Sequence, residues 1–222
     1  MVENAILKKT LKIEFWISIF VRLSILGVLI PSIIEKQYML VFAASSMLII
    51  SFVPSIIGKR YQLVLPPEFE IIVSLFLYAT FILGEMKSYY FTYWWWDILL
   101  HSFSAFILGL IGFVILYTFH YVEKINLSPI IAAIFSFNFA VTLGVMWEIF
   151  EFAADQFLGL NMKKSGIMDT MTDLIVDSIG ALIGAVMGYF YLKGGDSLII
   201  KRIVEKFVRQ NFNRKRKITF SL

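Results

Sequence analysis

The chain has 222 residues, of which 59% are hydrophobic and 16% are charged; its formal net charge is +4 and its mean hydropathy is +0.80. Soluble domains average about 45–50% apolar and about 25% charged residues, so an ordinary soluble domain is excluded and an integral membrane protein is predicted. The chain has no cysteine, which excludes disulfides, thiolate metal ligands and a cysteine nucleophile.

Six apolar runs approach the length of about 20 residues that a helix needs to cross a bilayer. They predict an all-α fold, a polytopic bundle of six transmembrane helices in one membrane domain, residues 1–192. The predicted spans are about 15–34, 38–57, 66–84, 94–119, 129–155 and 169–192. Pro66–Pro67 and Ser128–Pro129 mark two helix starts, where the N–H that proline lacks would be unpaired anyway. The first run has no small-residue cleavage site at its end, so we expect a retained span and no signal peptide.

The lysines and arginines predict the orientation. Placing both termini in the cytoplasm puts 15 of them inside and four outside, with Arg22 within the first span. We therefore expect a multi-pass protein of the cell (inner) membrane with both termini cytoplasmic.

The segment 193–222 is predicted to be a basic, amphipathic cytoplasmic tail. Its apolar residues recur at helical spacing among basic ones: Ile199, Ile200, Ile203, Val204, Phe207 and Val208 among Lys201, Arg202, Lys206 and Arg209. Four more basic residues follow at 214–217. Each basic residue near anionic lipid contributes about 1 kcal/mol, so membrane lipids with anionic headgroups are the expected partner. A tail that only fixes the topology is the alternative; no motif indicates nucleic-acid binding.

The last three spans each carry ionisable residues at spacings of three or four, which places them on one helix face. The residues are Asp97 and His101; Glu148, Glu151 and Asp155; and Asp169, Asp173 and Asp177. With a helical rise of about 1.5 Å per residue, Asp97, Glu151 and Asp173 are expected roughly 5–6 Å below the outer boundary, and His101, Glu148 and Asp177 roughly 10–12 Å below it. Ionisable residues inside spans mark a functional site by default.

Small residues continue each ionisable face at four-residue spacing, which lets membrane helices approach closely. They are Ala105 and Gly109; Ala140 and Gly144; and Gly180, Gly184 and Gly188. We therefore expect a tight bundle of the last three spans, sealed below the polar residues and open to the outer face as an acidic pocket.

Few basic residues lie near these carboxylates, so a bound divalent cation is the simplest expectation. The expected ligands are Asp97, His101, Glu148, Glu151, Asp173 and Asp177. Oxygen ligands with one imidazole suit Mg²⁺, Mn²⁺, Zn²⁺ or Fe. A di-iron centre is disfavoured, because such centres use two Glu-x-x-His pairs.

Other interpretations stay open. Asp155 and Asp169 also fit solvated loop ends, with Asp169 as a helix N-cap. Trp94–Trp96 and Trp147 fit an interfacial aromatic belt. The whole set also fits a purely structural polar network.

The pattern Trp96-Asp97…His101, Trp147-Glu148…Glu151 and Asp169-Thr170…Asp173…Asp177, with Gly180-Ala181 and Gly184-Ala185, resembles the YjdF family of bacterial inner-membrane proteins. The resemblance covers about Leu83–Tyr191 and implies a six-span inner-membrane protein of uncharacterised activity. The chain is also loosely similar to VanZ-like membrane proteins. Those have an arginine before the acidic pair and an asparagine near the glycines, where this chain has Asp177.

Three functions follow as hypotheses. The first is a metal-dependent hydrolase or transferase at the outer leaflet, acting on a lipid or lipid-linked substrate, with Asp97, His101, Glu148 and Glu151 as catalytic residues around a metal-activated water. The second is a cation- or proton-coupled transporter, although the acidic residues stop in the outer half and no inverted repeat is visible. The third is a non-catalytic membrane accessory or sensor protein.

Overall fold

The computed structural model describes residues 2–61, 63–123, 125–159, 162, 166–195, 204, 207–208 and 211–212. These residues form helices and connecting turns and contain no strand. Among them, six helices are long and apolar enough to cross a membrane, which confirms the six-span prediction. The six segments are Thr10–Ile34, Leu40–Arg60, Pro67–Met86, Trp96–Val122, Pro129–Phe157 and Ile167–Leu192.

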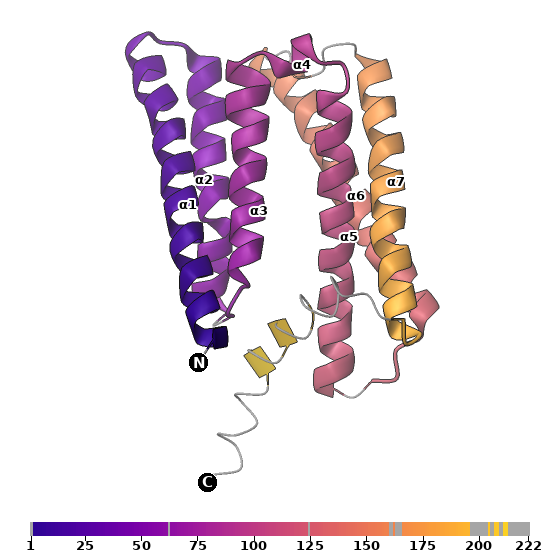
Figure 1. Ribbon diagram of the computed structural model, residues 1–222. Helices are drawn as coiled ribbons and strands as arrows, with labels where there is room; N and C mark the ends of the chain where they lie inside the picture. The colour runs from indigo at the N-terminus through magenta and orange to yellow at the C-terminus, as the bar shows by residue number, and fades with distance from the viewer. Residues whose placement is uncertain are drawn as a thin grey trace. The chain divides into compact units, whose positions relative to one another are not determined.

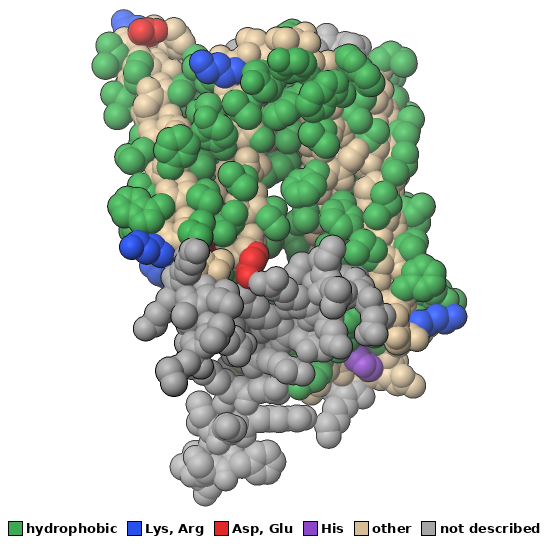
Figure 2. All heavy atoms as spheres, in the orientation of Figure 1, with side chains coloured by type: hydrophobic (Ala, Val, Ile, Leu, Met, Phe, Trp, Pro, Cys, Tyr) green, Lys and Arg blue, Asp and Glu red, His purple; other side chains and the backbone are tan. Residues whose placement is uncertain are grey.

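The chain divides into two compact units, Met1–Tyr93 and Trp94–Leu222 (Figure 1). The first unit contains α1 (Val2–Ile34), α2 (Tyr38–Arg60), α3 (Pro67–Leu77), the π-helix η1 (Tyr78–Met86) and the short helix α4 (Tyr89–Thr92). The second contains α5 (Trp96–Glu123), α6 (Pro129–Leu158) and α7 (Ile167–Leu192). On the face in view in Figure 2, the spans carry mainly hydrophobic side chains, while lysines and arginines lie near helix ends.

The helix starts predicted from proline are confirmed: Pro66 precedes α3, and Ser128 precedes α6 with Pro129 in its first turn. Two features differ from the predicted spans. Helix α1 begins at Val2, well before residue 15, because backbone hydrogen bonding continues past the apolar run. The third span changes from α- to π-helix at Tyr78, a change for which hydropathy carries no signal.

The first unit encloses a small apolar core together with a few polar side chains. The core consists of Val21, Ile25, Ala44, Leu77 and Phe81. Beside it, the Ser18 and Ser74 hydroxyls lie 3.1 Å apart. Arg22 Nη2 donates a 2.9 Å hydrogen bond to the Ser51 carbonyl oxygen, and its guanidinium carbon lies 4.2 Å from the centre of the Phe52 ring. Ser18 and Arg22 therefore find their partners inside this unit.

In the second unit, α5 and α7 pack along a glycine seam, as the four-residue spacing predicts. A Cβ on Gly184 would lie 2.8 Å from the Phe106 carbonyl oxygen, and one on Gly109 would lie 3.2 Å from that of Ala181. A Cβ on Gly180 would lie closer still to the Ser102 carbonyl oxygen. Because backbone meets backbone at these positions, the two helices leave no space between them along the seam.

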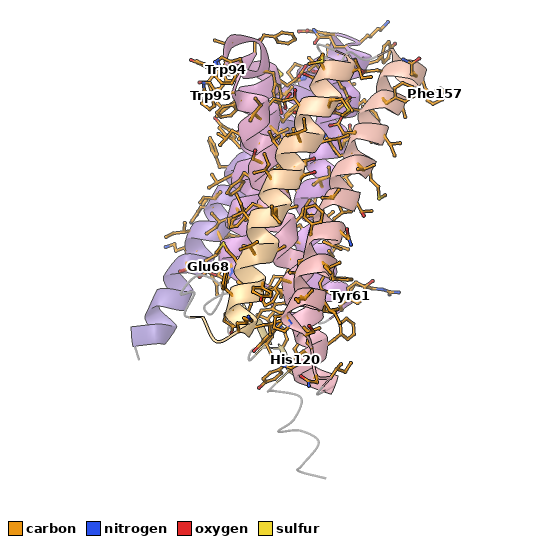
Figure 3. All side chains as sticks on the ribbon, turned by 90° about the vertical axis from the view of Figure 1, so that its right-hand side faces the viewer. Tyr61, Glu68, Trp94, Trp95, His120 and Phe157 are labelled. Carbon is orange, nitrogen blue, oxygen red and sulfur yellow. The ribbon has the colours of Figure 1, made fainter. Side chains whose placement is uncertain are left out.

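We call the end of the second unit where α5 and α7 begin the site end, and the opposite end the tail end. Trp94, Trp95 and Phe157 lie at the site end and His120 at the tail end (Figure 3). At the tail end, Val204 and Val208 are 1% and 2% exposed and belong to the apolar cluster of Leu110, Phe113 and Ala132. The basic residues of the predicted tail, Lys201, Arg202, Lys206, Arg209 and 214–217, lie outside the described residues.

Candidate functional site

Ionisable side chains from all three helices of the second unit converge at the site end. Helix α5 supplies residues from its first two turns, α6 from its last turns and α7 from its first three turns. They are Asp97 and His101; Glu148 and Glu151; and Asp169, Asp173 and Asp177. The helical period places each set on one face, and the glycine seam brings the faces of α5 and α7 together.

The deeper group consists of His101, Glu148 and Asp173, one residue from each helix. One donor atom from each of the three lies within 4.8 Å of the others. Glu148 and Asp173 are each 3% exposed. The spacing of the ionisable residues along the three spans predicts this convergence.

A second group lies beside the first and consists of Asp97, Asp169 and Asp173. Its carboxylate oxygens also lie within 4.8 Å of one another. Asp173 belongs to both groups, so the two groups are continuous. The Asp97 side chain is 26% exposed, which makes this group the more accessible one.

Asp169 was absent from the predicted ligand set. The interpretation of Asp169 as an N-cap is wrong: Gly166 is the N-cap residue, and α7 begins at Ile167. Asp169 therefore lies in the first turn of the helix, four residues before Asp173. The spacing Asp169–Asp173–Asp177 contains this signal, because it continues one helix face without a break.

Asp177 lies outside both groups and contacts the histidine. His101 Nδ1 and Asp177 Oδ1 are 3.3 Å apart, and His101 Nε2 lies 3.8 Å from Asp97 Oδ1. Gly144 allows this arrangement, since a Cβ there would lie 3.2 Å from Asp177 Cγ. A carboxylate on Nδ1 orients the ring and leaves Nε2 for another partner.

Glu151 also lies outside both groups. Its Oε1 accepts a 3.0 Å hydrogen bond from Trp147 Nε1, one helical turn earlier on α6. Trp147 therefore holds a site carboxylate, a role that its interpretation as a belt residue did not include. Asp155 Oδ1 accepts a 2.7 Å hydrogen bond from the Met162 backbone N–H, which agrees with a loop-end residue.

The site gathers six carboxyl groups around one imidazole. Glu148, Asp97 and Asp173 all act on Glu151 as like charges, and His101 is the opposing group. Lys193 is the only lysine or arginine among the described residues of the second unit, and it lies at the tail end after α7. Lys163 and Lys164 fall in the stretch that the structure does not describe.

Thr170 adds a neutral oxygen on the same face of α7. Its Oγ1 is buried and has no hydrogen-bond partner among the residues described. Other hydroxyls in these helices bond to a backbone carbonyl, as Ser104 does to His101 and Ser178 to Leu174. Thr170 is therefore available to a bound water or ligand. In the sequence, Thr170 stands out only as part of the motif Asp169-Thr170. A sequence alone does not show which buried hydroxyls lack a hydrogen-bond partner.

Chemically, the arrangement offers one imidazole nitrogen and several carboxylate oxygens within the spacing of a metal-ion shell. Metal–ligand bonds of about 2.0–2.4 Å leave ligand atoms on one ion at most about 4–5 Å apart. Both groups satisfy that condition.

Comparison with known proteins agrees with the membrane fold. The family described as "Predicted membrane protein (DUF2238)" matches residues 17–194. A relative from Thermotoga maritima, described only as an uncharacterized protein, is 29% identical over 128 residues, which cover 56% of this chain and 63% of the relative. The match thus spans less than two thirds of that relative. No solved structure matches the chain. The chain belongs to the DUF2238 family of predicted membrane proteins.

Proposed function

We propose that the site end of α5, α6 and α7 binds one or two divalent cations, and that the protein is a metal-dependent membrane hydrolase or transferase acting on a lipid or lipid-linked substrate. The observation that carries the proposal is the group of His101, Glu148 and Asp173, whose donor atoms come from three helices and lie within 4.8 Å of one another.

Three further observations support a cation. Asp177 on His101 Nδ1 resembles the carboxylate that commonly orients a metal-binding imidazole. The buried Thr170 hydroxyl fits a water or ligand in the site. Within the described part of the second unit, the one lysine or arginine is Lys193 at the tail end, and intramembrane charges are costly without a partner. Because Asp173 belongs to both groups, a bridged pair of ions is compatible with the residues.

The chemistry proposed is activation of water or polarisation of a substrate oxygen by the cation. We assign His101, Glu148, Asp173, Asp97 and Asp169 to binding, and Asp177 to orienting the histidine. Glu151 belongs to neither group, so we assign it the role of general base, held by Trp147.

The position of the site favours an amphiphilic substrate. The exposed Trp94 and Trp95 lie at the same end, and tryptophans favour the headgroup level of a bilayer. With both termini cytoplasmic, this end faces the outer leaflet. The inner-membrane location and the resemblance to the YjdF family stay predictions beside this proposal.

A transporter needs a route past the site. The backbone contacts at Gly109, Gly180 and Gly184 close the seam between α5 and α7. That closure favours a one-sided site over the alternative of a cation- or proton-coupled transporter. An accessory or sensor protein would also bind the cation but would turn over no substrate.

The test starts with metal analysis of protein purified in mild detergent. We expect a stoichiometric divalent ion in the wild type and its loss in Glu148→Gln and Asp173→Asn. Asp155→Asn is the matched control, because it removes a charge at the same end without touching either group, and it should keep the ion. Unchanged metal content in both site variants would remove the proposal.

Activity is tested separately, with phospholipids and lipid-linked phosphates in mixed micelles and chelator as control. Turnover lost with chelator and with Glu151→Gln supports the enzyme. Bound metal with no turnover of any lipid would leave the metal site and reject the enzyme. Cation flux into liposomes that Glu148→Gln abolishes would favour the transporter.

A further inference from the structure

A polar cluster in the first unit connects two helices near the beginning of the first and third spans. Glu14 lies four residues after Thr10, where the first span begins. Glu70 lies three residues after Pro67, where the third span begins. Both side chains are therefore attached roughly 5–6 Å inside the apolar segments. The two carboxyl groups are hydrogen-bonded to each other, which links α1 to α3.

This hydrogen bond requires a proton. An ionised carboxyl group has only acceptors, whereas a protonated one has an O–H donor. Glu14 and Glu70 can therefore bond to each other only while one of them is protonated. Two carboxyl groups that share one site retain a proton for the same reason, because both cannot ionise at this distance without strong repulsion.

Two serine hydroxyls favour Glu14 as the acceptor of the pair. Ser18 Oγ donates a 3.3 Å hydrogen bond to Glu14 Oε1 and lies 3.1 Å from Ser74 Oγ. Because the Ser18 hydrogen points to Glu14, Ser74 is the donor between the two hydroxyls. Both serines are buried, with 5% and 8% of their surface exposed. The buried hydroxyls thus stabilise an ionised Glu14, which favours Glu70 as the group that carries the proton.

The charge balance of the cluster agrees with one proton. Arg22 acts on Glu70 as the opposite charge, so one guanidinium stands against two carboxyl groups. With one proton the three groups sum to zero charge, and without it they carry one uncompensated negative charge. Because charge inside a span is costly, the singly protonated state is favoured.

The other charged residues on the packed helices are more exposed or more distant. Water and salt screen an exposed charge, so these residues compensate the pair weakly. They are the exposed Lys12 on α1, the exposed Lys59 and Arg60 on α2, the partly buried Glu68 on α3, and Glu85 on η1, fifteen residues beyond Glu70.

A groove gives this proton a route to water. Glu70 lines the groove together with Ser55 and Lys59 of α2 and with Leu63 and Leu65 of the segment that follows. Lys59 is exposed, so the groove reaches the surface of the unit. Water in the groove can take the proton from Glu70 and return it. With the predicted orientation, this surface faces the cytoplasm.

We propose that Glu14 and Glu70 hold one exchangeable proton, and that this proton joins α1 to α3 and makes the stability of the first unit sensitive to cytoplasmic pH. An unfolded glutamic acid releases its proton at about pH 4.3, whereas the folded pair retains one at neutral pH. Folding therefore binds a proton, and the stability that it contributes is lost as the pH rises and the pair ionises. This proton site is separate from the proposed metal site and does not depend on it.

Infrared difference spectra of the full chain in liposomes test for the shared proton, because a protonated carboxyl group has a carbonyl stretch that an ionised one lacks. Between about pH 6 and about pH 9, the wild type should lose such a band. Glu14→Gln and Glu70→Gln should each abolish that change, since the remaining carboxylate has Arg22 as its opposite charge and needs no proton. Glu35→Gln is the matched control: the exposed Glu35 of α1 bonds to Gln37, and the band should persist.

Thermal unfolding in micelles over the same pH range gives a second measurement. The wild-type midpoint should fall by about 2–4 °C more than that of Glu70→Gln, because the variant's amide donates to Glu14 at every pH. The carboxyl groups of the second unit are present in both proteins, so their own titration cancels in the comparison.

The proposal is overturned if neither substitution removes a carboxyl band, which would mean that a cation or water lies between two carboxylates. It is also overturned if Glu70→Gln removes the band but Glu14→Gln does not, because Glu70 would then hold its proton without sharing it. A wild-type midpoint that follows the same pH dependence as Glu70→Gln would reject the joining of α1 to α3.

Discussion

The two units of the molecule place polar side chains among apolar helices and satisfy them in different ways. In the first unit Ser18 meets Ser74, and Arg22 bonds to the Ser51 carbonyl oxygen. Its carboxyl pair, Glu14 and Glu70, lies near the opposite charge of Arg22. In the second unit, carboxylates face carboxylates, with His101 as the opposing group. Polar groups that satisfy one another inside a unit stabilise it, whereas clustered carboxylates repel one another unless a cation binds between them.

This difference separates polar residues that stabilise the fold from polar residues that bind a ligand. The polar contacts of the first unit need no ligand, so their removal should change stability alone. Substitutions in the site of the second unit should change ligand binding. Substitutions in its glycine seam should change both stability and ligand binding. Four substitutions test this division, in order of decreasing expected effect.

The largest effect is expected at the glycine seam. Gly184→Ala places a Cβ 2.8 Å from the Phe106 carbonyl oxygen, and backbone cannot move aside as a side chain can. Overpacking of this kind costs about 1–3 kcal/mol. Thermal unfolding in micelles should show the loss. Gly27→Ala on α1 is the control, because nothing lies within 4 Å of its Cβ position; equal stability of the two variants would contradict the closed seam.

Asp177→Ala should lower metal affinity by about 10–100-fold while full occupancy is still reached at high metal concentration. The reason is that a residue orienting a ligand typically contributes this amount. Calorimetric titration of metal-free protein measures it, with Asp155→Ala as the unaffected control. Complete loss of binding would instead make Asp177 a direct ligand, as predicted from the sequence.

Trp147→Phe removes the hydrogen bond to Glu151 and keeps an aromatic ring. Since Glu151 lies outside both groups, the metal dissociation constant should change by less than about threefold. A hydrogen bond to a charged group contributes about 1.5–3 kcal/mol, so turnover should fall about tenfold or more. The same titration and a rate measurement distinguish these effects; a loss of metal binding would place Glu151 among the ligands.

The smallest effect is expected in the first unit. Ser18→Ala removes the contact with Ser74 and the hydrogen bond to Glu14 Oε1. It should lower stability by about 0.6–1.2 kcal/mol, since such pairs in a membrane protein contribute about 0.6 kcal/mol each on average. Metal content should not change. Ser24→Ala serves as control, since the exposed Ser24 hydroxyl bonds to its own helix at Phe20. A change in metal content with Ser18→Ala would break the division between the two units.

Much of the candidate site was predictable from helical spacing. Asp97 and His101, or Asp173 and Asp177, are four residues apart and must share a face. The matching depths on the three spans also predicted that the faces meet. The actual groups mix the two predicted depths, however: His101 and Glu148 from the lower level meet Asp173 from the upper one. Relative rotation and tilt of helices decide such pairings, and residue spacing within one helix carries no information on them.

Residue spacing also does not predict which carboxylates belong to the two groups of possible metal ligands. Asp169 joins a group although it also fitted a loop end. Glu151 lies on the site face of α6 but joins neither group and accepts a hydrogen bond from Trp147. Both outcomes depend on side-chain partners that lie on a particular neighbouring turn or helix. Residue spacing alone could not show which carboxylates join the two groups.

The sequence by itself determined the membrane class, the six spans and the face of each helix on which the ionisable residues lie, because apolar run length and helical period are local properties of the chain. Only the tertiary structure decided which donor atoms come within 4.8 Å of one another. That distance depends on how closely three helices approach, which is set where Gly144 admits Asp177 and where α5 and α7 meet at their glycines.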